Sequence, residues 1–548
     1  MATEQVLERP TQDQPPRRRH LIAAGVAGLV AVGAGLAVGE LGAVLAGPDA
    51  SPYFAVGSSV VDHTPTAVRE WAITTFGTSD KTALFTGMGV IIAVLAAACG
   101  VLERRFPPVG SAVIALFGLV GVIAALGRPD ASWTAALPSV ATAVVAVVVL
   151  RWLVGLLPKV ARDLDTVPPL RSGPDSISRD TVPPLRSGSY SISGAAVSRR
   201  FILSAAGIAV AAAGVGVVAR RLVADAARTV ADRASLVLPR PASPAAPLPA
   251  GVDLPDAIPF VSSNADFYRI DTALQVPNVT TADWSLRIHG MVDNELTISW
   301  DELLAMPMVE RYTTLTCVSN EIGGDLIGNA RWLGVPMKTL LDRAGVKPGS
   351  TMLLSTSVDG WTCGTPVSAV TDGRDALLAV GMNGQPLPVE HGFPVRQVVP
   401  GLYGYVSATK WVSDWELTTF ENAQGYWTTR GWSALGPIKL ASRIDRPSSN
   451  STLRAGEVIV AGTAWAQHTG VRSVEVRIDN GPWQPAQLAT EYSVDTWRQW
   501  RYSWAATPGT HTVTCRAIDN KGTPQIEAIA DPIPDGATGL DSRTYQVT

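Results

Sequence analysis

The chain has 548 residues, enough for several domains, and its net charge of −3 at pH 7 gives no support to a nucleic-acid partner. Its four cysteines have no close pairing pattern, which argues against a disulfide framework or a zinc site. Gly, Ala and apolar residues concentrate in roughly the first 220 residues. We therefore expect a membrane region followed by a soluble region.

Five apolar runs are long enough to cross a bilayer, which takes about 20 residues. They lie at 21–46, 82–102, 109–127, 133–157 and 201–218. Arginines and lysines precede the first run, separate the second from the third, and separate the fourth from the fifth. By the positive-inside rule, the N-terminus is inside and everything after the fifth run is outside. The sequence thus predicts a cytoplasmic tail at 1–20 and a five-span membrane domain at 21–219.

The segment 158–200 between the fourth and fifth runs contains a duplication. DTVPPLRSGPDSIS at 165–178 is followed by DTVPPLRSGSYSIS at 180–193. Two copies are too few for a solenoid, and their Pro, Ser and Gly content is typical of a flexible linker. We interpret the segment as a cytoplasmic spacer. After the last span, 220–251 reads as a short helix and a Pro/Ala linker.

The domain expected at 252–433 interleaves short strands with short helices. Strands are predicted at 284–290, at 312–316 and at 351–358, and helices at 299–306 and 338–344, with a hairpin turn at Asn383-Gly384. No βαβ repeat is present, so the sequence predicts an α+β fold.

The residues from 434 to 548 have an all-β composition. Alternating strands are predicted at 458–465, 473–478, 499–504 and 511–518, with turns at Asn480-Gly481 and at 520–522. This pattern is typical of an Ig-like sandwich. The chain is thus expected to have three parts: an α-helical membrane domain, an α+β domain and an all-β Ig-like domain.

One cysteine stands out in the stretch YTTLTCVSNEIGGDLIGNARWL at 312–333. The alternating β-formers before Cys317 deliver its thiol to a strand end, and a glycine-rich loop follows. Such a thiol can face a buried ligand. The alternative is that Cys317 is a small buried hydrophobe, the usual fate of a free cysteine.

A second stretch, VEHGFPVRQVVPGLYGYVSATKW at 389–411, brings His391, Arg396 and Lys410 within twenty residues of one another. Together the two stretches resemble the sulfite oxidase family of molybdopterin enzymes. In that family a cysteine thiolate ligates molybdenum, and an EHG-x-P-x-R segment followed by a KW pair holds the pterin and its phosphate. The resemblance covers about 260–418 and continues more weakly through the C-terminal domain.

The resemblance implies a role for each matching residue. Cys317 would be the protein ligand of the metal, whose preference for soft sulfur donors fits a thiolate. Arg396 and Lys410 would hold the pterin phosphate, and the backbone amides around Ser407, Ala408 and Thr409, just before Lys410, would form an anion nest. The other residues that match cofactor contacts of the family are Asn264, Tyr268, Ser357 and His391. The alternative for His391 is a turn histidine that caps backbone.

The substrate side departs from the family pattern. Arg331 matches an arginine that helps to bind sulfite, but its alternative is a structural ion pair with Glu321 or Asp325. The family's early arginine is missing, and Trp361 takes the place of a tyrosine near the metal. An indole N–H can donate a hydrogen bond but cannot act as a phenol. Sulfite oxidation and sulfoxide reduction therefore both stay open.

Electron transfer is expected to need another protein, cytochrome or quinone-linked, because the sequence has no CxxCH haem motif and no Fe–S cysteine cluster. The lipid bilayer and, through the Ig-like domain, a second copy in a homodimer are the other expected partners. The twin arginine Arg199-Arg200 resembles a Tat signal, which would export a domain folded around its cofactor. The alternative to an enzyme is a non-catalytic module that binds an envelope component.

Overall fold

The computed structural model describes residues 16–46, 50–65, 68, 71, 75–76, 80–127, 133–157, 199–222, 225–273, 275–449 and 451–548. The chain divides into two compact units, Met1–Val223 and Ala224–Thr548, and each is described by itself. The duplicated spacer at 165–193 lies outside the described residues.

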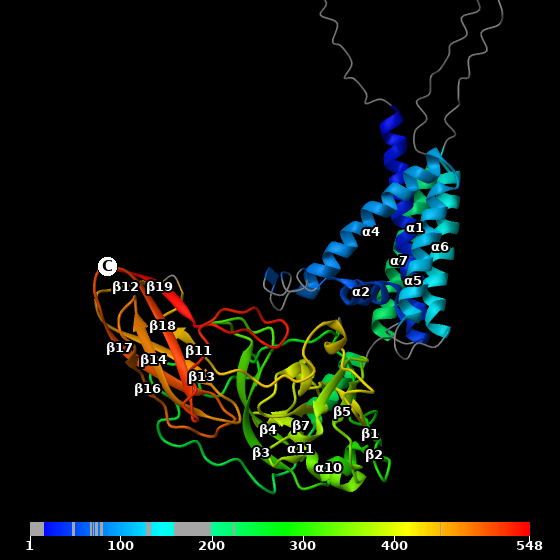
Figure 1. Cartoon of the computed structure of the whole chain (residues 1–548). Coiled ribbons are helices and arrows are strands. Elements are labelled where there is room, and N and C mark those ends of the chain that lie inside the picture. The colour runs from blue at the N-terminus through cyan, green and yellow to red at the C-terminus, as the bar shows by residue number, and fades with distance from the viewer. Residues whose placement is uncertain are drawn as a thin grey trace, which may run out of the picture. The chain divides into compact units, whose positions relative to one another are not determined.

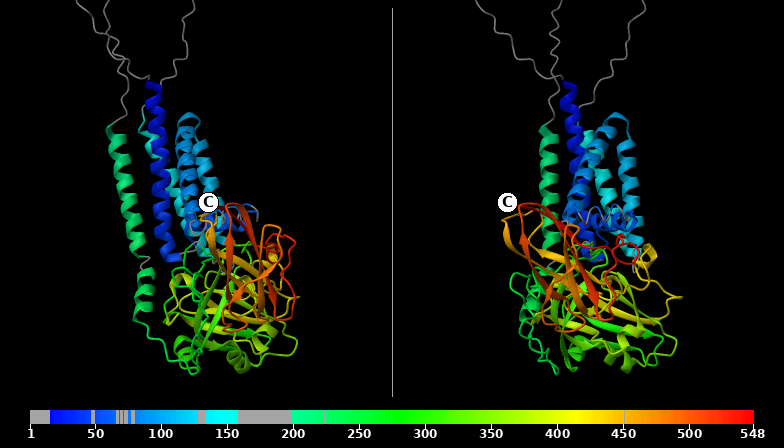
Figure 2. Two further views of the ribbon diagram at one scale, coloured as in Figure 1. Left: turned by 90° about the vertical axis from the view of Figure 1, so that its left-hand side faces the viewer. Right: turned by 60° about the vertical axis from the view of Figure 1, so that its left-hand side comes forward.

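The first unit is a helical bundle. Its helices are α1 (Pro16–Ala46), α2 (Pro52–His63), α4 (Asp80–Arg105), α5 (Val109–Leu126), η3 (Trp133–Ala136), α6 (Leu137–Gly155) and α7 (Arg199–Leu222). Helix α1 packs against α4, α6 and α7, and α5 packs against α4 and α6 (Figures 1 and 2). Small residues allow the close approach: a Cβ on Gly28 of α1 would lie 1.9 Å from the Ala96 carbonyl oxygen of α4.

Four helices of this unit are long and apolar enough to cross a membrane: His20–Ala43, Ala83–Arg105, Val109–Leu126 and Trp133–Gly155. They coincide with the first four expected spans. The fifth expected run forms α7, whose side chains are described only as far as Val215, and α7 is not among those four. The fifth span, and with it the side on which the second unit lies, remains a prediction.

The second unit begins with α8 (Asp225–Ser235), the short helix expected after the last apolar run. Arg233 of α8 donates to the carbonyl oxygens of Leu387 and Pro386, at 2.7 and 2.9 Å. The Pro/Ala-rich stretch that follows runs along the protein surface: Ser243 bridges to Val309, and the Tyr492 hydroxyl donates to the Ala246 carbonyl oxygen at 3.0 Å. It is therefore packed along its length.

Residues up to about 433 form the predicted α+β arrangement around two sheets. One sheet has the order β2-β1-β10-β5-β6 and the other β3-β4-β7-β8, with β9 paired to β7. The strands are β1 (Ser285–Gly290), β2 (Leu296–Ser299), β3 (Val309–Thr316), β4 (Ile327–Pro336), β5 (Met352–Ser357), β6 (Thr362–Pro366), β7 (Leu377–Met382), β8 (Gln385–Pro386), β9 (Arg396–Val398) and β10 (Val412–Thr418).

Short helices lie between these strands, and most of them bury side chains in the core: α9 (Trp300–Leu304), α10 (Met337–Ala344), α11 (Val367–Thr371), η4 (Val389–His391) and η5 (Gly404–Val406). After β10 comes η6 (Thr428–Arg430), which buries no residue. Helix α9 lies within the helix predicted at 299–306, and Ser299 caps it through a capping box with Glu302. Helix α10 buries Met337, Leu340 and Leu341 and ends at Gly345, whose φ of 70° suits glycine.

The C-terminal part is a two-sheet sandwich, drawn orange to red in Figure 2. Its sheets have the orders β11-β13-β17-β16 and β12-β19-β18-β14-β15. The strands are β11 (Ala441–Arg446), β12 (Thr452–Leu453), β13 (Gly456–Trp465), β14 (Val471–Ile478), β15 (Gln484–Pro485), β16 (Gln487–Leu488), β17 (Arg498–Ala506), β18 (Gly509–Asp519) and β19 (Ser542–Val547). All four strands predicted for this part are present.

Candidate functional site

Cys317 follows the last residue of β3, at the strand end where the sequence places it. Thr316 pairs with Ile327 of β4, and the Cys317 N–H donates to the Leu326 carbonyl oxygen at 2.9 Å, which closes the loop between the two strands. Cys317 is half-buried, whereas Cys99, Cys363 and Cys515 are buried. Its thiol is thus the most accessible of the four.

Desolvation raises the pKa of the Cys317 thiol, while hydrogen bonds from Ser319 and Val318 and the charge of Lys410 act in the opposite direction. A thiol in this setting keeps its proton until a cation stabilises the thiolate. Burial therefore makes the Cys317 thiol a poor free nucleophile at neutral pH.

Arg396 is a buried guanidinium at the start of β9, 5% exposed. It donates to the His391 carbonyl oxygen at 3.1 Å and lies over the Trp332 ring, 5.0 Å from the centroid. Burial lowers the pKa of Arg396 to about 10. No carboxylate forms an ion pair with it among the residues that the structure describes. A buried cation without a counter-charge is a strong indication of an anionic ligand.

Lys410 lies near Arg396 and is also buried. Its ammonium contacts the Asp271 carboxylate at 2.7 Å and the Glu390 carbonyl oxygen at 3.1 Å. Burial lowers the pKa of Lys410 to about 8, and Asp271 opposes this shift. Arg269 contacts the same carboxylate at 3.1 Å. Asp271 therefore balances only part of the positive charge.

His391 ends η4 and is buried. Burial, with Arg396 and Lys410 nearby, lowers the pKa of His391 to about 4, so the ring is neutral at pH 7. Its Nε2 lies 3.1 Å from the Asn264 carbonyl oxygen. Because a carbonyl only accepts, Nε2 carries the proton and Nδ1 can accept a hydrogen bond.

The segment before β1 carries Asn264 and Tyr268 to the same place. The Asn264 side-chain oxygen accepts from Asn383 at 2.8 Å. Burial raises the pKa of the Tyr268 phenol well above its usual range, and Cys317 and Arg396 are the charged groups that act on it. The structure therefore gathers these two residues with Cys317, His391, Arg396 and Lys410, as the family resemblance implies.

The run from Ser407 to Thr409 is buried but already hydrogen-bonded. The amides of Ser407 and Ala408 donate to the Gly404 carbonyl oxygen at 3.3 and 3.0 Å. The Thr409 hydroxyl lies 2.6 Å from that of Ser355. The expected anion nest thus has two of its amides occupied within η5, and this part of the cofactor assignment stays a prediction.

Ser357 and Trp361 lie in one turn at the end of β5. The Ser357 N–H donates to the Trp361 carbonyl oxygen at 2.9 Å, and the neighbouring Val358 N–H donates to the Trp411 carbonyl oxygen at 2.9 Å. The turn is therefore next to the Lys410–Trp411 backbone. No hydrogen bond among the described residues joins either side chain to Cys317.

Arg331, expected to bind substrate or, alternatively, to pair with Glu321 or Asp325, forms an ion pair with Glu310 at 3.3 Å. The reason is the β3–β4 register, which sets Arg331 opposite Tyr312 and leaves Glu310 on the adjacent strand. The Tyr312 position is four residues before Thr316, or roughly 13 Å along the strand. This placement favours a structural ion pair.

A small pocket next to Thr316, the residue before Cys317, could not be predicted from the sequence. Thr316 and Asn320 line it from the cysteine loop, Tyr403 from the segment before η5, and Lys439 and Ser442 from the Ig-like part. Burial raises the pKa of Tyr403 to about 12, and Cys317 is among the groups that act on it. Only the GLYGYV run before Ser407 hinted at Tyr403, since glycines around an aromatic residue are typical of a packed binding segment.

The residues present fit a phosphate-bearing cofactor that also binds a metal. Arg269, Arg396 and Lys410 exceed the nearby carboxylates Asp271 and Glu390 in charge. The hydroxyl of Thr316 and the amide nitrogen of Gln397 are buried and have no hydrogen-bond partner within the described structure. Unpaired buried donors, excess positive charge and an accessible thiol form the donor set that such a group requires.

Comparison with known proteins agrees with this geometry. The family described as oxidoreductase molybdopterin binding domain matches residues 273–427, and the bacterial Ig domain family matches 441–515. The chain is 29% identical over 321 residues to the mitochondrial sulfite oxidase of Rattus norvegicus, which covers 50% of this chain and 58% of that protein. The chain thus spans little more than half the length of that relative.

Two further relatives extend the comparison. The chain is 34% identical over 153 residues to the uncharacterized oxidoreductase YuiH of Bacillus subtilis (strain 168), covering 28% of this chain and 74% of that protein. The crystal structure of the sulfane dehydrogenase SoxCD from Paracoccus pantotrophus aligns with a TM-score of 0.47 and 20% identity, over 54% of this chain and 85% of that chain. The chain belongs to the sulfite oxidase family of molybdopterin-dependent oxidoreductases.

Proposed function

We propose that this protein is a membrane-anchored, extracytoplasmic oxidoreductase that transfers an oxygen atom at molybdenum to or from a small S-oxo or N-oxo substrate. The single observation that supports it best is the buried Arg396 guanidinium, which has no carboxylate partner in the described structure and which, like the half-buried Cys317, acts on the buried phenol of Tyr268. The bound Mo-molybdopterin would supply the two-electron redox centre, which no side chain of the chain can provide.

The protein's own residues bind and orient that group. Cys317 supplies one soft ligand, and Arg396 with Lys410 holds the phosphate. His391 stays neutral and offers Nδ1 as an acceptor, while Asn264 fixes its tautomer. The Tyr268 phenol keeps its proton and can donate it in a hydrogen bond. The other proposed cofactor contacts are Ser357, Ser407, Ala408 and Thr409.

The charges around the pocket favour a neutral S-oxide over sulfite. Lys439, which lines the pocket, contacts Asp535 at 2.7 Å, and Glu321 lines the same pocket. Arg331 is paired with Glu310. A small dianion would therefore meet no unpaired cation at this wall, whereas a sulfoxide needs only a hydrogen-bond donor. Its reduction takes two electrons and two protons and releases a sulfide and water.

The electrons would come from a separate protein, cytochrome or quinone-linked. The side of the membrane follows from five spans and from the twin arginine at the start of α7, Arg199-Arg200. Export of the folded, loaded domain through the Tat route is tested by Arg199→Lys/Arg200→Lys. Normal export of the double variant, measured by protease access in spheroplasts, would contradict this part of the proposal.

The first test is the molybdenum content per chain of detergent-purified protein from cells competent in cofactor synthesis. Wild type and the control Cys99→Ser should carry near-stoichiometric metal, because the Cys99 thiol is buried in the helical unit with Ala31 and Ile114. Cys317→Ser should lose activity and change the metal EPR spectrum. A metal-free wild type would favour the alternative, a non-catalytic module whose Ig-like domain binds an envelope component.

The expected homodimer through residues 434–548 is a separate proposal. It rests on the family resemblance of the Ig-like domain, and the mass of the detergent-solubilised protein tests it.

A further inference from the structure

The strand that carries Cys317 is an edge strand. In the order β3-β4-β7-β8, β3 has a sheet neighbour on one side only. The free edge of such a strand presents unpaired N–H and C=O groups, and its position is less constrained than that of a central strand. At its beginning, the N–H of Glu310 donates to the Ser243 carbonyl oxygen at 2.9 Å. Nearer to Cys317, the Ig-like part covers the edge.

The hydrogen bonds between the Ig-like part and this edge centre on Thr314, which is fully buried and lies three residues before Cys317. The Thr314 N–H donates to the Asp495 carbonyl oxygen at 3.0 Å, and the Gln467 side-chain amide donates to the Thr314 carbonyl oxygen. The Trp497 N–H donates to the Thr314 hydroxyl oxygen at 2.8 Å. Both backbone groups and the side chain of Thr314 are thus bound by the Ig-like part.

The same contact reaches the segment that carries Asn264 and Tyr268. The Thr314 hydroxyl donates to the Asn329 side-chain oxygen at 3.1 Å, and the Asn329 amide donates to the Phe260 carbonyl oxygen at 2.9 Å. The Trp497 indole N–H donates to that same carbonyl oxygen, also at 2.9 Å. Thr314 and Trp497 therefore connect β3, which leads to Cys317, with the segment that leads from Phe260 to Asn264.

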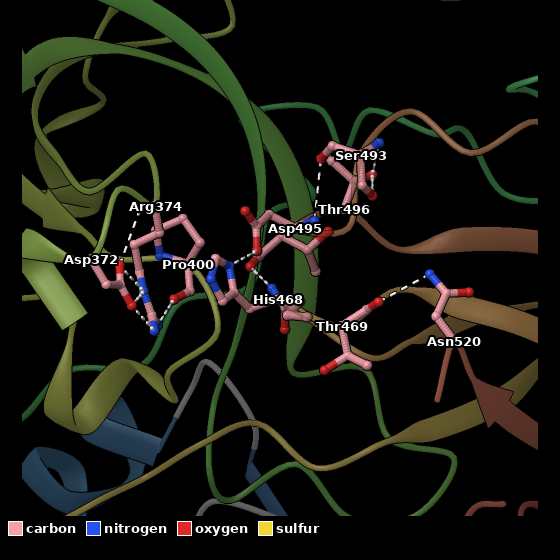
Figure 3. A network of polar contacts seen from close by, with 11 residues as sticks. Asp372, Arg374, Pro400, His468, Thr469, Ser493, Asp495, Thr496 and Asn520 are labelled. Atoms are coloured by element: carbon pink, nitrogen blue, oxygen red, sulfur yellow. Dashed lines mark hydrogen bonds and ion pairs between the residues drawn. The ribbon is translucent and has the colours of Figure 1, made fainter. Parts of the chain in front are cut away.

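The loop of the Ig-like part that makes these contacts is itself fixed, as Figure 3 shows. The His468 ring lies against the Asp495 carboxylate, with Nδ1 3.2 Å from Oδ1, and the Asp495 N–H donates to the Ser493 hydroxyl at 3.2 Å. Next to His468, Arg374 donates to the Pro400 carbonyl oxygen at 2.8 Å. Asp495 is therefore held in place where it meets Thr314.

We propose that the Ig-like domain positions the candidate metal ligand Cys317. Gln467, Asp495 and Trp497 bind Thr314 and thereby fix the end of β3 that leads to Cys317. These are positioning residues, since none of them is placed against the cofactor. The ligand role of Cys317 rests on the proposed function, whereas the hold on the β3 edge does not. A break in this contact should release the cysteine even when no metal is bound.

The test uses the full chain in detergent, purified without cofactor, and measures the rate at which iodoacetamide alkylates Cys317. The other three cysteines are buried, so the reaction is selective. Thr314→Val keeps the side-chain shape but removes the hydroxyl, and it should raise the rate at least threefold. Thr314→Ser should restore it to within 1.5-fold of wild type. Thr510→Val removes an exposed hydroxyl of β18, bonded to Gln546, and serves as the matched control.

A second variant with its own control keeps the proposal testable if Thr314→Val does not fold. Gln467→Ala removes one donor to β3 and should also speed alkylation, whereas Gln487→Ala, on the exposed strand β16, should not. All variants are compared at a temperature where circular dichroism shows each to be folded. Wild-type alkylation rates in both Thr314→Val and Gln467→Ala would overturn the proposal.

The loaded enzyme gives an independent signature. Thr314→Val should shift the g-values of the metal EPR signal and lower kcat at least fivefold with KM within twofold, and Thr314→Ser should recover both. A wild-type spectrum in Thr314→Val would also count against the proposal. If wild type binds no molybdenum, the proposed function fails, but the alkylation rates still decide whether the Ig-like domain holds Cys317.

Discussion

The buried guanidinium of Arg396 should cost the protein stability when no cofactor is bound. Burial lowers the pKa of Arg396 from 12.5 to about 10. At about 1.4 kcal/mol per pKa unit, the charged form is penalised by about 3 kcal/mol below pH 10. Arg396→Met removes this penalty and keeps most of the side-chain volume.

The substitution also has a cost, which the structure allows us to estimate. The carbonyl oxygens of His391 and Gln397 lose their donor, at about 1 kcal/mol each, and the stacking on Trp332 contributes about 0.5 kcal/mol more. The two sides nearly cancel. We therefore expect the cofactor-free Arg396→Met protein to match wild type within about 1 kcal/mol in unfolding free energy.

The assay is urea unfolding of the cofactor-free chain in detergent, followed by tryptophan fluorescence, with molybdenum content measured separately on loaded protein. Arg396→Met should lose most of its cofactor although its stability is retained. The control Arg516→Met removes a half-buried guanidinium that pairs with Glu475 at 2.8 Å, and it should keep its cofactor. A loss of more than about 2 kcal/mol in cofactor-free Arg396→Met would refute the reasoning, because the charge would then be stabilising.

Three further outcomes are expected. Burial lowers the pKa of His391 from 6.5 to about 4, so the unfolded chain binds the proton at a higher pH than the folded chain. The free energy of unfolding of the cofactor-free protein should therefore fall by up to about 3 kcal/mol as pH falls from 6.5 to 4. His391→Asn should reduce this pH dependence in urea unfolding, and an unchanged dependence would contradict the prediction. Arg331→Met should leave KM within about threefold and cost less than about 1 kcal/mol, because its contact with Glu310 is a half-exposed ion pair; a KM increase of tenfold would place Arg331 at the substrate. Gly462→Ala should lower the free energy of unfolding by more than about 2 kcal/mol, because a Cβ at this position would lie 2.5 Å from the Trp500 ring. Calorimetry should show this as a lower thermal midpoint, and an unchanged midpoint would show that β13 can shift.

Local patterns were enough to predict the elements. Alternation before Cys317 predicted a strand that ends there, and the pattern at 299–306 predicted the short helix α9. Both signals depend only on neighbours in the chain, so they do not need the fold. The same holds for four apolar helices of the first unit and for β13, β14, β17 and β18 of the sandwich, whereas its other strands were not predicted.

The site residues were predicted from the resemblance of two motifs to a known family. The structure brings the predicted cofactor residues together but gives Arg331 an unpredicted partner. His391, Arg396 and Lys410 gather because they are close in sequence, whereas Asn264 and Tyr268 join them through tertiary contacts such as that of Asn264 with His391. The partner of Arg331 could not be predicted, since a one-residue change in the β3–β4 register would give it a different neighbour.

Only the tertiary structure decided which groups balance the buried charges and what fixes the cysteine strand. Asp271 reaches Lys410 from 139 positions away in sequence, and Gln467 reaches Thr314 from 153. Nothing local to either residue marks it, because a carboxylate after a turn and an amide after a strand are common on surfaces. Contacts of this kind arise from the packing of whole domains, whereas strands, helices and motifs depend on residues near one another in the chain.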